Sequence, residues 1–186
     1  MNIVPLEVAH VYDFLQWTPH EDPLYGMFNF VETRETVPEW YAWKTASIFD
    51  TYFAIVVDDF AVGYMGLKGM NPLLRRGEIG IILDRAQMDR GYGRRALTWL
   101  LDYGFQKRHL ERISLSVYPW NHRALHLYES LGFQPIRQRE QLISNRWVRQ
   151  MGPALDPYRE FLVPRGGQWR LLETVMVLKR KDWSDI

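Results

Sequence analysis

The sequence predicts an α/β fold, a mixed β-sheet with helices packed on it. The chain has 186 residues, of which 47% are apolar and 24% charged, as expected of a globular protein with a substantial buried core. Runs of β-branched and aromatic residues alternate with segments whose apolar residues recur at helical spacing. The order of these segments is strands first, followed by β-α-β-α-β-β.

The first part of the chain is predicted to be rich in loops. Residues 6–17 have the pattern of a helix, or of a strand that leads into a helix. Three prolines then interrupt residues 18–40, which favours loops with short helical turns. The run Thr51–Val57 is typical of a strand, and the turn residues Asp58 and Asp59 follow it. We therefore expect a helix over residues 40–49, a strand over 51–57 and a returning strand over 60–68.

Periodicity predicts the remaining elements. After a loop over residues 69–77, residues 78–83, which are mostly apolar after Glu78, are predicted to form a strand. Residues 92–107 carry apolar side chains at helical spacing, and residues 112–118 alternate between apolar residues and serines, as a strand does. Apolar residues at i, i+3, i+4 and i+7 from Ala124 predict a helix that ends at Gly132. The chain is then expected to be extended over 134–142, irregular over 144–168 and a strand over 171–179.

The composition excludes several kinds of chemistry. There is no cysteine, so disulfides, thiolate metal sites and a cysteinyl intermediate are excluded. Neither a signal-peptide pattern nor a run of 18 apolar residues is found, which predicts a cytoplasmic protein without a membrane partner. His122 and His126 stand four residues apart, but no third ligand is evident, so we expect a solvated helix face and no metal. We expect one domain over residues 1–186.

A glycine-rich turn between a predicted strand and a predicted helix has the chemistry of a phosphate site. Gly91 and Gly93 let the backbone approach an anion closely, and a helix start offers unpaired N–H groups with partial positive charge. Arg90, Arg94 and Arg95 add three fixed positive charges. The alternative is an ordinary helix start with solvated arginines. A P-loop is excluded, because the motif G-x-x-x-x-G-K-[ST] does not occur.

The same turn also satisfies the dinucleotide-binding pattern G-x-G-x-x-A over residues 91–96. That pattern needs an acidic residue at the end of the next strand to hold a ribose. Glu111 has about the right spacing but precedes its strand, and the strand ends at Tyr118-Pro119-Trp120 without an acid. Dinucleotide binding is therefore the second of two interpretations.

Two motifs carry a further indication. The first is Met88-x-x-Gly91-x-Gly93, and the second is N-x-x-A-x-x-L-Y-x-x-x-G-F over residues 121–133. Together they resemble the GNAT superfamily of acetyl-CoA-dependent N-acetyltransferases, and the resemblance covers about residues 51–135. The terminal strand is similar to that of ribosomal-protein N-terminal acetyltransferases and spermidine acetyltransferases. Met88 departs from the pattern, because the family usually has Gln or Arg there.

The resemblance implies a mostly antiparallel, twisted sheet with helices on both faces, and a role for each segment of the site. Ile81, Ile82 and Leu83 would bind the pantetheine arm through their main chain. Asn121 would contact the cosubstrate near its sulfur. Tyr128 would lie near the thioester and, as a phenol, would protonate the leaving thiolate. The pyrophosphate would be held by the loop residues Met88, Asp89, Arg90, Gly91, Tyr92, Gly93, Arg94 and Arg95.

The general base and the acceptor are less constrained by the sequence. Glu78, at the start of the strand that would bind the cosubstrate, is the first candidate base. Residues 18–40 are rich in acidic and aromatic side chains, which suits a cationic amine. More broadly, residues 1–60 hold ten Asp and Glu against two Lys and Arg, and residues 61–186 hold twelve against 21. The two parts would either attract ligands of opposite charge or form a salt-bridged interface.

These observations predict an acetyl-CoA-dependent N-acyltransferase that moves an acetyl group to a primary amine by direct attack in a ternary complex. The acceptor would be a small cationic amine or a peptide N-terminus, and neither nucleic acid, membrane nor metal is expected. The alternatives are a non-catalytic acyl-CoA-binding regulatory module and a dinucleotide-binding protein. Residues 144–168 would be an acceptor lid or the arm of a homodimer.

Overall fold

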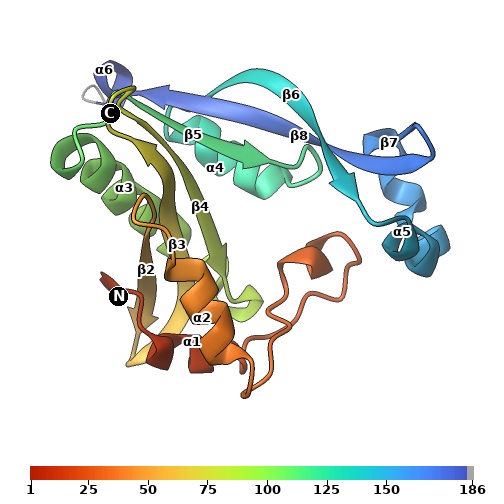
Figure 1. The fold of residues 1–186 in the computed structure, drawn as a ribbon, viewed down its shortest axis with the longest axis horizontal. Coiled ribbons are helices and arrows are strands. Elements are labelled where there is room, and N and C mark those ends of the chain that lie inside the picture. Colours follow the sequence, from red (N-terminus) through yellow and green to blue (C-terminus); the bar gives the residue numbers. More distant parts are fainter. Residues whose placement is uncertain (184–186) are drawn as a thin grey trace.

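The computed structural model describes residues 1–183, whose eight strands form one twisted sheet (Figure 1). The strands lie in the order β1-β2-β3-β4-β5-β8-β6, and β7 pairs with β8. Every neighbouring pair is antiparallel except β4 and β5, which are parallel. The predicted mixed, mostly antiparallel sheet is confirmed. The strands are β1 (Asn2–Pro5), β2 (Thr51–Val57), β3 (Phe60–Asn71), β4 (Arg76–Leu83), β5 (Arg112–Val117), β6 (Gln134–Ile143), β7 (Leu162–Arg165) and β8 (Gln168–Lys179).

Helical segments connect these strands. Among residues 1–183, no helix is long and apolar enough to cross a membrane. The α-helices are α1 (Val8–Phe14), α2 (Val37–Thr45), α3 (Tyr92–Asp102), α4 (His122–Ser130), α5 (Asn145–Met151) and α6 (Arg180–Trp183). Segments of 3₁₀ helix are η1 (Tyr25–Phe28), η2 (Arg85–Gln87) and η4 (Gly152–Phe161), and the π-helical turn η3 (Tyr103–Lys107) extends α3.

Helices cover both faces of the sheet because successive side chains of a strand point to opposite faces. In β2, Phe53 and Ile55 join the main core, to which α3 and α4 contribute Leu97 and Tyr128. Ala54, between them, faces a second core that includes side chains of α1 and α2. The predicted placement of helices on both faces is therefore confirmed.

A third core joins the N-terminal loop to a segment near the C-terminal end of the sequence. Leu24, Trp120, Leu155 and Leu171 are buried in it, and they come from the N-terminal loop, the segment before α4, η4 and β8. In addition, the hydroxyl of Tyr158 donates a hydrogen bond to the Asp22 carboxylate at 2.5 Å. The C-terminal arm formed by α5, η4 and β7 therefore fixes the position of the N-terminal loop.

Four details of the predicted secondary structure were wrong. Residues 144–168 are ordered as α5, η4 and β7 rather than irregular, because their apolar side chains enter the third core. The helix predicted over 40–49 spans Val37–Thr45, since Pro38 in its first turn is compatible with a helix start. The loop predicted over 69–77 is shorter, because β3 and β4 reach into it, and β1 was not predicted. Gly132 ends α4 with φ +86°, as expected.

Candidate active site

The sheet opens at the junction of β4 and β5. These strands pair only where Arg76, Gly77 and Glu78 meet Arg112, Ile113 and Ser114. Beyond that point β4 pairs with β3 alone and β5 pairs with β8, so the two strands separate within the described structure. Figure 1 shows the sheet spreading from this point into two wings. The edge of β4 from Ile79 to Leu83 therefore has no strand partner on its β5 side, and its main-chain groups are available to a ligand.

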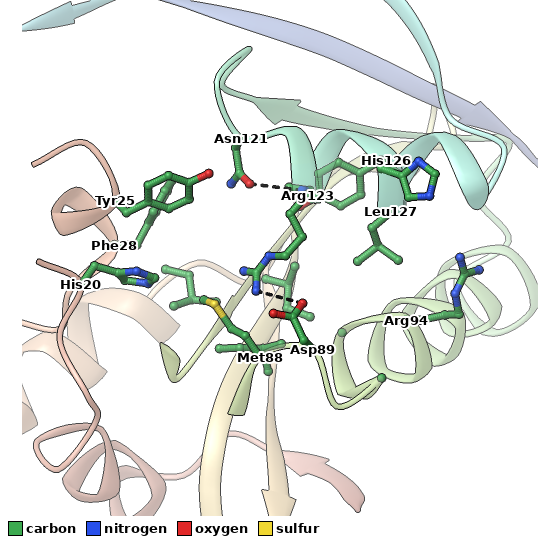
Figure 2. A pocket seen from close by; sticks show the side chains of 17 residues that line it. His20, Tyr25, Phe28, Met88, Asp89, Arg94, Asn121, Arg123, His126 and Leu127 are labelled. Atoms are coloured by element: carbon green, nitrogen blue, oxygen red, sulfur yellow. Dashed lines mark hydrogen bonds and ion pairs between the residues drawn. The ribbon is translucent and has the colours of Figure 1, made fainter. Parts of the chain in front are cut away.

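A cavity of about 390 Å³ lies at this opening, a size in the usual range for small-molecule sites. Its walls come from the N-terminal loop, the end of β4, the turn before α3 and helix α4, as Figure 2 shows. The lining residues are His20, Tyr25, Phe28, Ile81, Ile82, Leu83, Met88, Asp89, Gly91, Gly93, Arg94, Asn121, Arg123, Ala124, His126, Leu127 and Tyr128.

The glycine turn forms one wall of the cavity. Gly91 caps α3 with φ +77°, a left-handed conformation that favours glycine. Gly91 and Gly93 both line the cavity, so the unpaired N–H groups of the first turn of α3 lie beside it. The guanidinium of Arg94 donates to Ser130 Oγ at 2.5 Å, which fixes it against α4 (Figure 2). These features fit a site for a phosphate group.

Not all of the predicted loop residues line the cavity. Met88, Asp89, Gly91, Gly93 and Arg94 do, and so do Ile81, Ile82 and Leu83 of β4. Arg90 and Arg95 are exposed outside the cavity walls, and Tyr92 packs against the main core. Of the three arginines expected around a phosphate, only Arg94 is held at the cavity.

Asn121 and Tyr128, the two residues predicted on α4, both line the cavity. The Oδ1 atom of Asn121 accepts a hydrogen bond from the Ala124 N–H at 3.2 Å and caps the helix. Only 9% of Tyr128 is exposed, and burial raises the pKa of its phenol to about 12. Among the described residues its hydroxyl has no hydrogen-bond partner, so it is available to a ligand in the cavity.

Three cavity residues, His20, Tyr25 and Phe28, come from the N-terminal loop. Tyr25 and Phe28 belong to the aromatic residues of 18–40 that were expected to suit an amine, whereas His20 was not predicted. Asn29 holds the backbone of His20 from both sides, at 2.7 and 3.0 Å. The imidazole stacks on Tyr25 at 5.6 Å, and burial, followed by the charges of Arg85 and Arg123, lowers its pKa. The loop reaches the cavity because Asp84, just after β4, accepts the N–H of Thr18. Nothing in the local sequence pattern indicates this long-range contact.

Glu78, the predicted base, lies at the fork of the strands but outside the cavity walls. Its partner in β5, Ser114, is the last residue that pairs with β4. The side chains of Glu78 and Ile82 point to the face opposite Ile79, which is buried in the main core. On that opposite face the Glu78 carboxylate forms a 3.1 Å ion pair with Lys68.

Two further expectations change. Among the acidic residues of 18–40, none lines the cavity, and the Asp22 carboxylate already accepts bonds from Tyr158 and from two backbone N–H groups. His126 was assigned to a solvated face; it is exposed but borders the cavity beside Leu127 (Figure 2). No cluster of metal-binding side chains occurs among the described residues.

Among the ion pairs of the described residues, Glu21–Arg85 connects the acidic part of the chain (residues 1–60) with the basic part (residues 61–186). One such pair does not make a salt-bridged interface between the two parts.

The chain belongs to the acetyltransferase (GNAT) domain family, whose model matches residues 1–134. This match confirms the predicted family. Acetyl-CoA is the acyl donor of that family, so the predicted cosubstrate is confirmed as well. The G-x-G-x-x-A match over residues 91–96 is therefore part of an acetyltransferase loop rather than of a dinucleotide-binding turn.

Among curated proteins, the chain is similar to an uncharacterized N-acetyltransferase p20 of Bacillus licheniformis, at 32% identity over 115 residues, or 61% of this chain and 62% of that one. It is also similar to spermidine N(1)-acetyltransferase of Escherichia coli K12, at 33% identity over 81 residues, or 44% of each chain. The matches thus span less than two thirds of these relatives.

The solved structures show the same fold. A spermidine N-acetyltransferase from Vibrio cholerae, solved in complex with CoA and spermine, superimposes with a TM-score of 0.70 at 18% identity, covering 98% of this chain and 97% of that one. The predicted GNAT fold is therefore confirmed, and at this identity the likeness is one of fold.

Proposed function

We propose that this chain transfers the acetyl group of acetyl-CoA to a primary amine, in a ternary complex and without an acyl-enzyme. The observation that carries the proposal is the cavity at the β4–β5 fork, which joins a helix N-terminus with glycines to a buried tyrosine without a protein partner. Such a cavity accommodates a long ligand with phosphate at one end and a reactive group at the other. The acceptor is a small cationic amine or a peptide N-terminus.

The residues present fit acetyl-CoA. The free edge of β4 at Ile81, Ile82 and Leu83 would bind the amide groups of the pantetheine arm as a neighbouring strand would. The first-turn N–H groups of α3 and the Arg94 guanidinium would hold the pyrophosphate. Asn121, whose Oδ1 is engaged in capping, offers its amide N–H groups to the cosubstrate or to a water.

The reaction is an aminolysis of a thioester. The lone pair of the neutral amine attacks the carbonyl carbon, a C–N bond forms, the C–S bond breaks and the amine loses a proton. Since the pKa of Tyr128 is raised to about 12, its phenol stays protonated at neutral pH. Full proton transfer to a thiolate, whose thiol has a pKa of about 8.5, is then uphill by about 5 kcal/mol. Tyr128 therefore acts mainly as a hydrogen-bond donor to the departing sulfur.

Two groups are candidates to take the proton of the amine. Glu78 lies at the fork, on the face opposite the main core, but its carboxylate is held by Lys68. His20 lines the cavity, and its lowered pKa keeps the imidazole neutral at pH 7. The variants Glu78→Gln and His20→Gln distinguish these two candidates. The variant that has lost the base should show its largest decrease in kcat at a pH where the acceptor amine is largely protonated.

The proposed activity is tested by mixing the purified chain with acetyl-CoA and a panel of amines and following release of free thiol. Amine-dependent thiol release that Tyr128→Phe strongly reduces supports an enzyme. Binding of acetyl-CoA without thiol release for every amine would instead show a non-catalytic acyl-CoA-binding module.

A further inference from the structure

An aromatic cage surrounds the side chain of Lys44. The Nζ atom lies 4.9 Å from the ring centroid of Tyr52, 5.2 Å from that of Tyr64, and 5.5 Å from those of Trp40 and Trp43. Rings that converge on one ammonium group are an arrangement by which proteins recognise cationic ligands. In this chain the cation is supplied by helix α2 itself. We call these four rings the Lys44 cage.

The Lys44 cage lies beside the strand that would bind acetyl-CoA. Tyr52 covers Gly66, where an added Cβ would meet its ring at 2.4 Å. Gly66 is the register partner of Gly80 in β4, and Tyr64 is the partner of Ile82. The cage is therefore about one strand away from β4, on the face that also carries Glu78. An amine that reached the fork on the side of Glu78 would share this face with the cage.

The described charged groups around the cage provide no excess of negative charge that would attract an additional cation. Lys44 forms no ion pair with a described carboxylate, and burial, followed by the charge of Lys68, lowers its pKa. Lys68 pairs with Glu78 at 3.1 Å. The Asp50 carboxylate accepts the N–H of Gly69 at 2.8 Å. Within residues 1–183, each of the two carboxylates near the cage is thus already engaged, while two ammonium groups are present.

We propose that Lys44 is a specificity-determining residue that disfavours polycationic acceptors. Its ammonium occupies the cage that would otherwise receive a second cationic group of an acceptor, and its charge repels such a group. The chain then acetylates amines that carry a single positive charge in preference to polyamines. This inference rests on the proposed acetyltransferase function and narrows its acceptor class.

The test uses Lys44→Ala, which empties the cage, and Lys107→Ala as a control, because Lys107 is exposed at the end of η3. Thiol release from acetyl-CoA is measured with spermidine and with butylamine, and the ratio of their kcat/KM values is compared. We expect butylamine to be preferred by the unaltered chain and the ratio to shift toward spermidine by about tenfold in Lys44→Ala. The Lys107→Ala ratio should not change. A preference for spermidine in the unaltered chain, or an unchanged ratio in Lys44→Ala, would overturn the proposal.

A binding measurement separates failure of this inference from failure of the proposed function. Spermine is titrated into each protein without acetyl-CoA, and the fluorescence of Trp40 and Trp43, which lie in the cage, reports binding. Spermine should bind Lys44→Ala about tenfold more tightly than the unaltered chain, even if no amine is acetylated. Equal affinities would refute the role of Lys44. If Lys44→Ala does not fold, Lys44→Met keeps most of the packing, removes the charge and should shift both readouts in the same direction.

Discussion

Replacing Tyr128 with phenylalanine isolates the hydroxyl that faces the cavity. In the described structure this hydroxyl has no hydrogen-bond partner, while the ring is buried against the core and packs on Phe133 at 6.0 Å between centroids. Phenylalanine retains the ring contacts. No protein hydrogen bond is lost, because the hydroxyl makes none in the described structure. We expect the melting temperature to change by no more than about 2 °C, since about 1 kcal/mol corresponds to about 2–4 °C for a chain of this size.

The effect on turnover should be much larger. A hydrogen bond to a charged group contributes about 1.5–3 kcal/mol, and the charge on the sulfur develops only in the transition state. Loss of this bond therefore lowers kcat by about 10- to 150-fold. The affinity for CoA should stay within about twofold, because the uncharged thiol gains little from the same contact.

The assay combines initial rates of thiol release, a CoA titration and thermal melting of Tyr128→Phe. Tyr103→Phe is a matched control, because Tyr103 packs against the same core and stacks on Trp99 but lies outside the cavity walls. A Tyr128→Phe variant with unchanged kcat would refute the assigned role. So would an equal loss of kcat in both variants, because that result would indicate a general effect of packing.

Four further predictions follow from the geometry. Arg94→Ala should weaken CoA binding by about tenfold or more in a titration, whereas Arg90→Ala should change it by less than about threefold, because Arg94 is fixed at the cavity wall and Arg90 lies outside it. Gly63→Ala should destabilise the fold by about 1–3 kcal/mol in denaturant unfolding, since its Cβ would lie 2.7 Å from the Ile82 carbonyl oxygen. Burial raises the pKa of Tyr128 to about 12, so ionisation of this phenol should not lower kcat as the pH rises through 10. A decline of kcat near pH 10 that is absent in Tyr128→Phe would contradict the raised pKa. Initial rates at varied acetyl-CoA and amine should give intersecting double-reciprocal lines, and parallel lines would contradict a ternary complex.

The elements on one side of the cavity were predictable because they depend on local patterns. The β-branched run of β2 and the spacing of Ala124, Leu127 and Tyr128 each follow from a single periodicity. The turn at Gly91 follows from the conformations that only glycine adopts readily, and its φ of +77° agrees. These features identified most of the residues that line one side of the cavity.

The other side of the cavity depends on contacts between distant parts of the chain. His20 is placed by the bond from the Thr18 N–H to Asp84, 66 residues later in the chain. Leu155 and Leu24 are both buried in the third core. Residues 144–168 therefore form an ordered arm, although their sequence has no regular pattern of apolar residues. The acidic composition of the N-terminal loop predicted a site for a cationic amine, but the Asp22 carboxylate instead accepts a hydrogen bond from Tyr158 of this arm. Composition and spacing do not encode such long-range pairings.

A crystal structure of the complex with CoA tests the central claim most directly. We predict the pyrophosphate at the N–H groups of Gly91 to Arg94, the pantetheine arm along the free edge of β4, and the sulfur within hydrogen-bonding distance of the Tyr128 hydroxyl. A complex in which CoA lies outside the β4–β5 fork, or in which its sulfur points away from Tyr128, would contradict the proposed site and mechanism.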